Sequence, residues 1–145
     1  MRTEKLRPDS LRLGAAKLPA VAVAGLVLIA ASPAPTVAIT GRVLGASGAH
    51  PVYVALWDAA GFQSKPVQQI RLGADGSFRF EVAPGRWAVS AFEDVNENGV
   101  LDMGLFGPKE PAAFWRPYHA YRKPRFEDVA MQVDGTLSDA NISLR

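Results

Sequence analysis

Apolar and polar side chains alternate along several short stretches of this chain after about residue 36, and apolar residues at helical spacing are absent there. The alternation is clearest in residues 77–82, where Phe78, Phe80 and Val82 are separated by single polar residues. An alternation with a period of two places apolar side chains on one face of a β-strand. The pattern therefore predicts a strand that buries the face carrying these three residues.

The same alternation predicts six more strands, in residues 37–43, 51–57, 67–72, 86–93, 126–133 and 140–144. The second of these is apolar on both faces, which is typical of a central strand. Residues 73–76 read Gly-Ala-Asp-Gly, and they predict a hairpin between 67–72 and 77–82 because such residues tolerate positive φ. Seven short strands at this spacing indicate an all-β fold, a seven-stranded antiparallel β-sandwich of the transthyretin-like or immunoglobulin-like kind.

Residues 94–125 form one long stretch without a predicted element. A connection of about 30 residues is far longer than usual in a compact domain, and such loops are typically functional or disordered. The aromatic content of this one argues against disorder. We therefore expect a long ordered flap that packs on one end of the sandwich.

The N-terminus has the pattern of a targeting segment. A basic start is followed by a 14-residue apolar run, residues 18–31, which is short for a membrane span but suits a secretory signal. Small residues at Thr36 and Ala38 predict cleavage after Ala38, giving a leader of residues 1–38 and a domain of residues 39–145. We expect export to the periplasm, outer envelope or extracellular space, with no obligate membrane span in the mature form. An uncleaved inner-membrane anchor is the alternative.

The basic character of the chain belongs to this leader. The chain has 16 Lys and Arg against 14 Asp and Glu, and residues 1–38 hold 5 and 2 of them, which leaves 11 against 12. A domain with a net charge of −1 is not expected to bind nucleic acid. The chain has no cysteine, so neither a disulfide nor a lipid-modified cysteine is available to it, whereas a bound metal ion is another means of stabilising a small domain.

Residues 94–102 have the spacing of a calcium loop, with oxygen-bearing side chains at positions 1, 3, 5 and 9 and a glycine at position 6. Leu105 stands at position 12, where an EF-hand has a glutamate, so we expect a structural Ca²⁺ site of another kind. Its affinity should lie near about 10⁻⁴–10⁻³ M, as in extracellular modules. Alternatives are an Asx-rich turn without metal, or another ion. The predicted ligands are Asp94, Asn96, Asn98, the Val100 carbonyl, Asp102 and, from the flap, Glu110.

An aromatic and basic stretch in the flap is a candidate ligand surface. It contains Trp115, Tyr118, His119, Tyr121 and Arg122. Rings that stand beside cations suit an anionic glycan, a lipid headgroup or a partner protein of the envelope. The alternative is a packed flap whose cations face water.

An enzyme is the other class of function that we consider. Glu93, Asp94, Asp102 and Glu110 contain the carboxylates that acid–base hydrolysis requires, which makes a hydrolase the alternative function. The sequence shows no nucleophile–base set, phosphate-binding glycine loop or zinc spacing, so we assign no catalytic residue and expect no enzyme. His50 lies in a turn, where we expect it to be solvated.

Five motifs occur in an order that resembles a known family. They are residues 75–80 (Asp-Gly-Ser-Phe-Arg-Phe), 83–89, 94–102, 107–111 (Gly-Pro-Lys-Glu-Pro) and 124–128. In this order they resemble the DUF2141 family of exported bacterial proteins of unknown function, over roughly residues 36–145. The resemblance implies a small β-sandwich with no established activity. Trp87 and Trp115 depart from the family's usual tyrosine and small polar residue. Together these observations predict an exported, calcium-stabilised β-sandwich that acts as a binding or structural module of the cell envelope.

Overall fold

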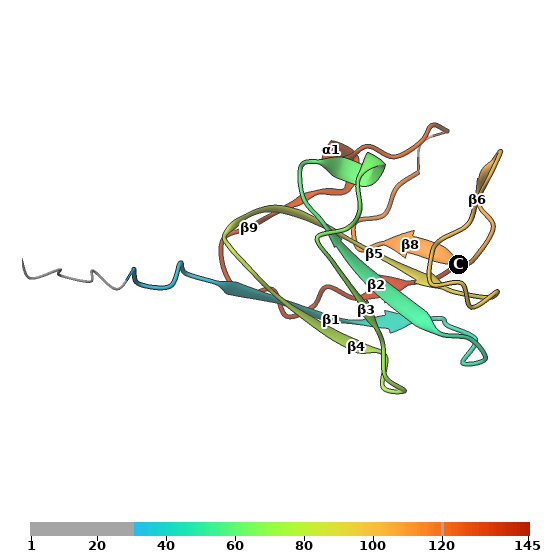
Figure 1. Ribbon diagram of the computed structural model, residues 1–145, viewed down its shortest axis with the longest axis horizontal. Coiled ribbons are helices and arrows are strands. Elements are labelled where there is room, and N and C mark those ends of the chain that lie inside the picture. Colours follow the sequence, from blue (N-terminus) through green and yellow to red (C-terminus); the bar gives the residue numbers. More distant parts are fainter. Residues whose placement is uncertain (1–30, 120) are drawn as a thin grey trace, which may run out of the picture. The chain divides into compact units, whose positions relative to one another are not determined.

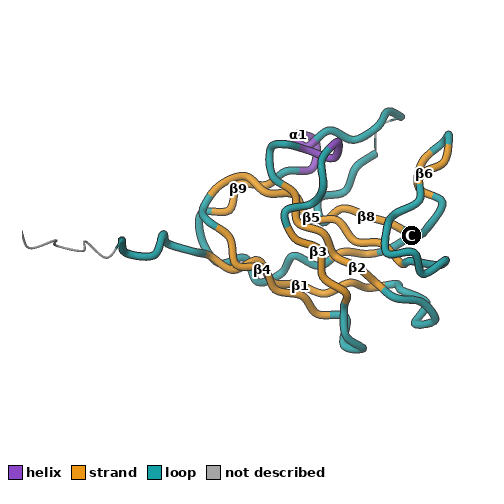
Figure 2. Tube along the Cα trace, in the orientation of Figure 1, coloured by secondary structure: helices purple, strands orange, loops and turns teal. Residues whose placement is uncertain are grey.

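A computed structural model of the protein describes residues 31–119 and 121–145, and Pro33–Arg145 form one compact unit. Figure 1 shows two sheets in this unit, and Figure 2 shows the loops that join their strands. The first sheet has the order β10-β1-β4, from β1 (Val37–Leu44), β4 (Ser77–Val82) and β10 (Ile142–Ser143). The second has the order β3-β2-β5-β8, from β2 (Val52–Trp57), β3 (Gln68–Arg71), β5 (Gly85–Glu93) and β8 (Ala112–Phe114), with β9 (Met131–Val133) paired to the start of β5. The fold is therefore all-β, as predicted.

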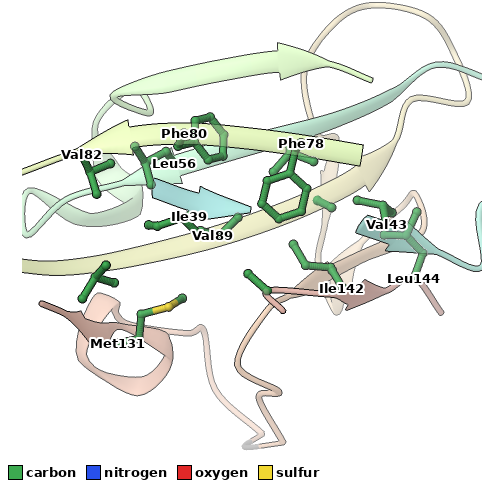
Figure 3. Close-up of a cluster of buried hydrophobic side chains, with 14 residues drawn as sticks. Ile39, Val43, Leu56, Phe78, Phe80, Val82, Val89, Met131, Ile142 and Leu144 are labelled. Atoms are coloured by element: carbon green, nitrogen blue, oxygen red, sulfur yellow. The ribbon is translucent and has the colours of Figure 1, made fainter. Parts of the chain in front are cut away.

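The main hydrophobic core is built from strands of both sheets. Phe78, Phe80 and Val82 are buried on β4, and they cluster with Ile39 of β1 and Val89 of β5 (Figure 3). The polar residues between them on β4 are exposed, so the alternation of residues 77–82 correctly predicts which face is buried. Burying a large apolar side chain contributes about 1.5–3 kcal/mol relative to leaving it exposed, and this cluster is therefore the main source of stability in the fold.

Strand β2 is central, as its sequence predicts. It pairs with β3 on one side and with β5 on the other. Val54, Ala55 and Leu56 are consecutive and all buried, so both faces of the strand are covered. A second, smaller core contains Ala88, Phe126, Val129 and Ala130, with Trp57, Phe62, Phe114 and Tyr118 packed against it.

The predicted hairpin between residues 67–72 and 77–82 is wrong. Strand β3 pairs with β2 and strand β4 pairs with β1, so residues 73–76 connect the two sheets. The turn itself forms, since the N–H of Gly76 donates to the carbonyl of Gly73 at 3.0 Å and Gly76 has a φ of 66°. The two strands separate because β4 buries three apolar residues beside β1, whereas β3 is exposed except for the half-buried Ile70 and fits the edge of β2.

The single strand predicted for residues 126–133 is also wrong. The segment forms a short helix, α1 (Phe126–Val129), followed by β9. The carboxylate of Asp128 accepts a hydrogen bond from the N–H of Arg125 at 2.7 Å, and this caps the start of the helix. Phe126 and Val129 lie three residues apart, so the helix turns both of them into the second core.

The strand count and one strand direction also differ from the prediction. The described residues form ten short strands, not seven, and β10 runs parallel to β1 in an otherwise antiparallel arrangement. Ile142 and Leu144 are buried, as the alternation in residues 140–144 predicts. The chain already runs beside β1 in the same direction before β10 begins, since Leu137 forms a parallel bridge with Ile39.

The flap, residues 94–125, contains short elements of its own. Strand β8 extends the second sheet beside β5, and β6 (Met103–Gly104) forms a hairpin with β7 (Gly107–Pro108). Figure 1 shows this hairpin standing clear of the two sheets. A single 3-10 turn, η1 (Gly61–Gln63), lies between β2 and β3.

Most of the predicted leader, residues 1–30, lies outside the described residues. Ala38, after which cleavage is predicted, is buried within β1, and its carbonyl accepts a hydrogen bond from Leu137 at 2.8 Å. Across residues 31–119 and 121–145, no helix has the length and apolar character needed to span a bilayer.

Candidate functional site

The loop at residues 94–102 starts from a fixed backbone at the end of β5. The N–H of Asp94 donates to the carbonyl of Pro51 at 2.8 Å, and the N–H of Glu93 donates to that of Pro111 at 2.9 Å. The root of the loop is thus joined both to the segment before β2 and to the segment before β8. These two hydrogen bonds fix the backbone position from which the side chain of Asp94 extends.

Asp94 organises the loop from the inside. Its side chain is fully buried, with 0% exposure. One carboxylate oxygen accepts the N–H of Asn98 at 3.1 Å, and the other accepts the N–H of Gly99 at 2.7 Å. Glu97 and Gly99 have φ values of 58° and 79°, and these left-handed conformations bend the chain back over Asp94.

Glu110, which the sequence predicts as a further ligand, closes the loop from the flap. It is 8% exposed, and its two carboxylate oxygens accept the N–H groups of Val95 at 2.9 Å and Asp102 at 3.1 Å. The N–H of Lys109 donates to the carbonyl of Asp102 at 2.8 Å. One side chain therefore joins the beginning and the end of the loop.

Three further predicted ligands meet on the outer side of the loop. One carboxylate oxygen of Asp102 accepts hydrogen bonds from the side-chain amides of Asn96 and Asn98, the latter at 3.1 Å. Val100 contributes its N–H, which donates to the amide oxygen of Asn98 at 3.0 Å. The structure therefore brings together Asp94, Asn96, Asn98, Asp102 and Glu110, and it places Val100 beside them.

The side chains of this loop carry the kinds of oxygen atom that bind hard cations. Carboxylate and amide oxygens are the ligands that Ca²⁺ takes. The two amides direct their nitrogens toward Asp102, and a half-turn of each amide would present its oxygen there instead. Among residues 31–119 and 121–145, no three acidic, histidine or cysteine side chains group as a metal-binding cluster, so amide and backbone oxygens have to complete the set.

The charge of the loop is uncompensated by basic side chains. Within the described ranges the ion pairs are Arg79 with Glu81 and Arg122 with Asp128, both away from the loop. Asp94 and Glu110 thus bring two buried carboxylates that only backbone N–H groups stabilise. Each of these carboxylate oxygens has a further lone pair that a cation could use.

A polar cluster next to the loop is missed by the sequence analysis. Glu93 is buried at the end of β5, and its carboxylate accepts hydrogen bonds from the Ser47 N–H, at 3.0 and 3.1 Å, and from the Ser47 hydroxyl. The hydroxyl of Ser47 lowers the pKa of Glu93 below its usual value, and the nearby charge of His50 adds to this. His50 is half-buried with a buried Nδ1, so it is not the solvated residue that its turn predicts. The feature of the sequence that could have indicated this cluster is a glutamate at the end of an apolar strand.

The aromatic and basic stretch of the flap divides between two clusters. Trp115 packs against the main core and donates its indole N–H to the Asp139 carbonyl at 3.4 Å. Tyr118 packs against the second core and donates its hydroxyl to the Arg122 carbonyl at 2.7 Å. His119 and Tyr121 are exposed.

Arg122 is held in a pair of charge-assisted hydrogen bonds. Its two guanidinium nitrogens lie 2.7 Å from the two carboxylate oxygens of Asp128. These bonds lower the pKa of Asp128 to about 2 and raise the pKa of Arg122. Of the five predicted surface residues, His119 and Tyr121 therefore offer the freest side chains, and Trp115, Tyr118 and Arg122 already serve the packing of the flap.

The carboxylates proposed for hydrolysis are occupied by structural contacts. Asp94 and Glu110 accept backbone N–H groups with all four of their oxygens, and Glu93 is engaged by Ser47. Two shallow surface hollows in the described residues are lined by other side chains. An arrangement of this kind holds a loop in shape, and it gives no support to a hydrolase.

Known proteins similar to this chain come from a structure comparison and from a family profile. A crystal structure of a DUF3823 family protein from Parabacteroides merdae ATCC 43184 is similar to the chain, with 15% sequence identity and a TM-score of 0.41. The similarity covers 77% of this chain and 46% of that one, so the chain spans less than half of that protein's length. No curated protein matches the chain. A family profile described as an uncharacterized protein conserved in bacteria (DUF2141) matches residues 48–141, and the chain therefore belongs to the DUF2141 family.

Proposed function

We propose that the protein is an exported, calcium-stabilised β-sandwich that serves as a binding or structural module of the cell envelope. The observation that carries the proposal is that two buried carboxylates, Asp94 and Glu110, hold one loop without a basic side chain at ion-pairing distance in the described residues. Asn96 and Asn98 lie at the same place and add neutral oxygen donors.

A bound divalent ion would neutralise the negative charge of the carboxylates in this loop. An ionised carboxylate has about four acceptor sites, so one or two N–H bonds leave lone pairs free for a metal. Asp94 and Glu110 are positioned by their N–H bonds and keep this capacity. An ion bound to the loop would offset the charge of these two carboxylates, and amide and backbone oxygens would complete its ligand set.

The ion would act on the flap more than on the sandwich. Asp102 and Glu110 flank the β6–β7 hairpin, and Asp94 directly follows the long strand β5. A metal shared by these residues ties the hairpin to the second sheet. With calcium tenfold above its dissociation constant, binding adds about 1.4 kcal/mol to the free energy of unfolding, a real share of the roughly 5–15 kcal/mol typical of a domain.

The expected location of the protein suits such a site. The basic start and the apolar run at residues 18–31 favour export, and calcium is plentiful outside the cytoplasm. Weak calcium sites are typical of extracellular modules. The chain also has no cysteine, so a metal ion replaces the disulfides on which small exported domains often rely.

The test is thermal unfolding of the full chain in millimolar calcium and in chelator. We expect calcium to raise the Tm by about 5 °C, the shift that about 1 kcal/mol produces in a domain of this size. Asp102→Asn should remove this shift. Asp75→Asn, which changes an exposed aspartate in the turn before β4, should keep it. A wild-type Tm that is the same in calcium and in chelator would falsify the proposal.

A further inference from the structure

The tip of the β6–β7 hairpin presents two large apolar side chains to solvent. Leu105 is 97% exposed and Phe106 is 103% exposed. They form the two-residue loop between Gly104 and Gly107, and the hairpin that carries them stands away from both sheets (Figures 1 and 2). Met103 on β6 is 54% exposed, which extends the apolar surface along the hairpin.

Neither the turn nor the core of the protein requires these two side chains. Two-residue hairpin loops favour asparagine, aspartate and glycine, which adopt positive φ or cap the turn. Here Gly107 has a φ of 139°, so the glycine supplies the unusual backbone conformation. Single exposed apolar residues are common, but two adjacent ones at the end of a projection form a patch that is typical of an interaction site.

A cation lies beside this tip. A Cβ added at Gly104 would lie 3.5 Å from Cγ and 3.6 Å from Cε of Lys109. The side chain of Lys109 therefore lies over Gly104, the residue directly before the loop of Leu105 and Phe106. Glycine at position 104 leaves the space that this side chain occupies.

We propose that the hairpin tip inserts into the interface of a lipid bilayer, with Leu105 and Phe106 among the acyl chains and Lys109 at the anionic phosphates. A lysine that runs along an apolar tip can reach a phosphate while its stem stays in the apolar region. Its positive charge is complementary to an anionic leaflet.

The size of the tip favours lipid over a protein partner. A fully exposed leucine and phenylalanine offer roughly 400 Å² together, since an aromatic side chain contributes about 150–250 Å². A stable protein–protein interface needs about 800 Å² from each partner. A narrow apolar tip with an adjacent cation can enter a fluid lipid interface without any complementary pocket. This inference goes beyond the proposed function and uses residues other than the ion ligands.

The experiment uses the full chain with a single cysteine, which is possible because the natural sequence has none. An environment-sensitive fluorophore is attached to Phe106→Cys, and the labelled protein is titrated with vesicles of phosphatidylethanolamine and phosphatidylglycerol. We expect a blue shift and a several-fold rise in emission. Labels at Val67→Cys and Ala74→Cys, two other exposed positions, should keep the emission seen in water. All titrations are made in chelator, so the result does not depend on the ion site.

Two further arms test the partner chemistry. Adding Lys109→Gln to the labelled Phe106→Cys protein should raise the lipid concentration for half response about fivefold on these anionic vesicles, and should change little on phosphatidylcholine. Adding Leu105→Ser should weaken the response on both. The inference is overturned if the label at residue 106 keeps its emission in water with all vesicles, or if all three labels shift equally. It is also overturned if raising the protein concentration without lipid produces the same shift, because the tip would then bind a second copy of the chain.

Discussion

The carboxylate of Glu110 accepts the backbone N–H of Asp102 at 3.1 Å, and this contact closes the base of the β6–β7 hairpin. The other oxygen of Glu110 accepts the N–H of Val95, so the same side chain also holds the start of the loop. The buried side chain of Glu110 therefore joins the start of the loop, at Val95, to its end, at Asp102. The shape of the loop therefore depends on Glu110 whether or not an ion is bound.

Glu110→Gln should destabilise the protein in chelator by about 1–3 kcal/mol, because an amide has one acceptor oxygen and leaves one buried N–H without a partner. Urea unfolding of the full chain, followed by tryptophan fluorescence, measures this change. Glu81→Gln is the matched control, since Glu81 is exposed and pairs only with Arg79 at the surface. Equal urea midpoints for Glu110→Gln and Glu81→Gln would show that the hydrogen bonds of Glu110 contribute nothing to the free energy of unfolding.

Phe80→Ala should cost about 3–5 kcal/mol, because Phe80 is 1% exposed and its removal leaves a cavity in the main core. Phe106→Ala makes the same chemical change at the hairpin tip, where the side chain is exposed, and should alter the free energy of unfolding by less than about 0.5 kcal/mol. Both values come from urea unfolding. A large loss at Phe106 would mean that the tip packs within the monomer.

Gly41→Ala should destabilise the protein by about 1–3 kcal/mol or more, because a Cβ there would lie 2.3 Å from the carbonyl oxygen of Ala140. That oxygen is backbone, so it cannot rotate away, and β1 would have to separate from the segment before β10. Gly135→Ala is the control, since a Cβ at that position meets nothing within 4 Å. Thermal unfolding of both variants makes the comparison, and a Tm for Gly41→Ala equal to that of the control contradicts the packing described here.

Asp128 should make stability depend on pH at the acid end. Arg122 lowers the pKa of Asp128 from 3.8 to about 2 in the folded protein. The folded state therefore binds this proton less readily than the unfolded state, and the contribution of Asp128 is complete above about pH 4 and is lost as the pH falls toward 2. Asp128→Asn should remove this part of the acid dependence. Unfolding midpoints between pH 5 and pH 2 measure it.

Arg122→Gln provides an independent check of the same contact. Without the guanidinium, the pKa of Asp128 in the folded protein should lie closer to its usual value, so the variant should be less stable than wild type above about pH 4 and should lose less stability between pH 4 and pH 2. If wild type, Asp128→Asn and Arg122→Gln lose stability in parallel over this range, the Arg122–Asp128 contact has no role in acid unfolding.

Local patterns predicted the features that depend on neighbours in the sequence. Alternation identified the buried face of β4 because side-chain direction has a period of two whatever the strand pairs with. The spacing of residues 94–102 indicated a loop curled around oxygen ligands, and the structure places Glu110 against both ends of that loop. The pattern in residues 126–133 failed, because capping by Asp128 and burial of Phe126 and Val129 favour a helical turn over a strand in the first half.

The sequence by itself determined that the chain is all-β, which faces of its strands are apolar, and which loop residues have oxygen-bearing side chains. Tertiary structure alone decided that β3 pairs with β2 instead of β4, that β10 lies parallel to β1, and that Leu105 and Phe106 remain outside the core. The physical reason is that any exposed strand edge offers the same backbone hydrogen bonds, so the choice of partner depends on which combination buries the most apolar surface. Strand pairing therefore depends on how the whole chain packs, and it cannot be predicted from the sequence of one strand alone.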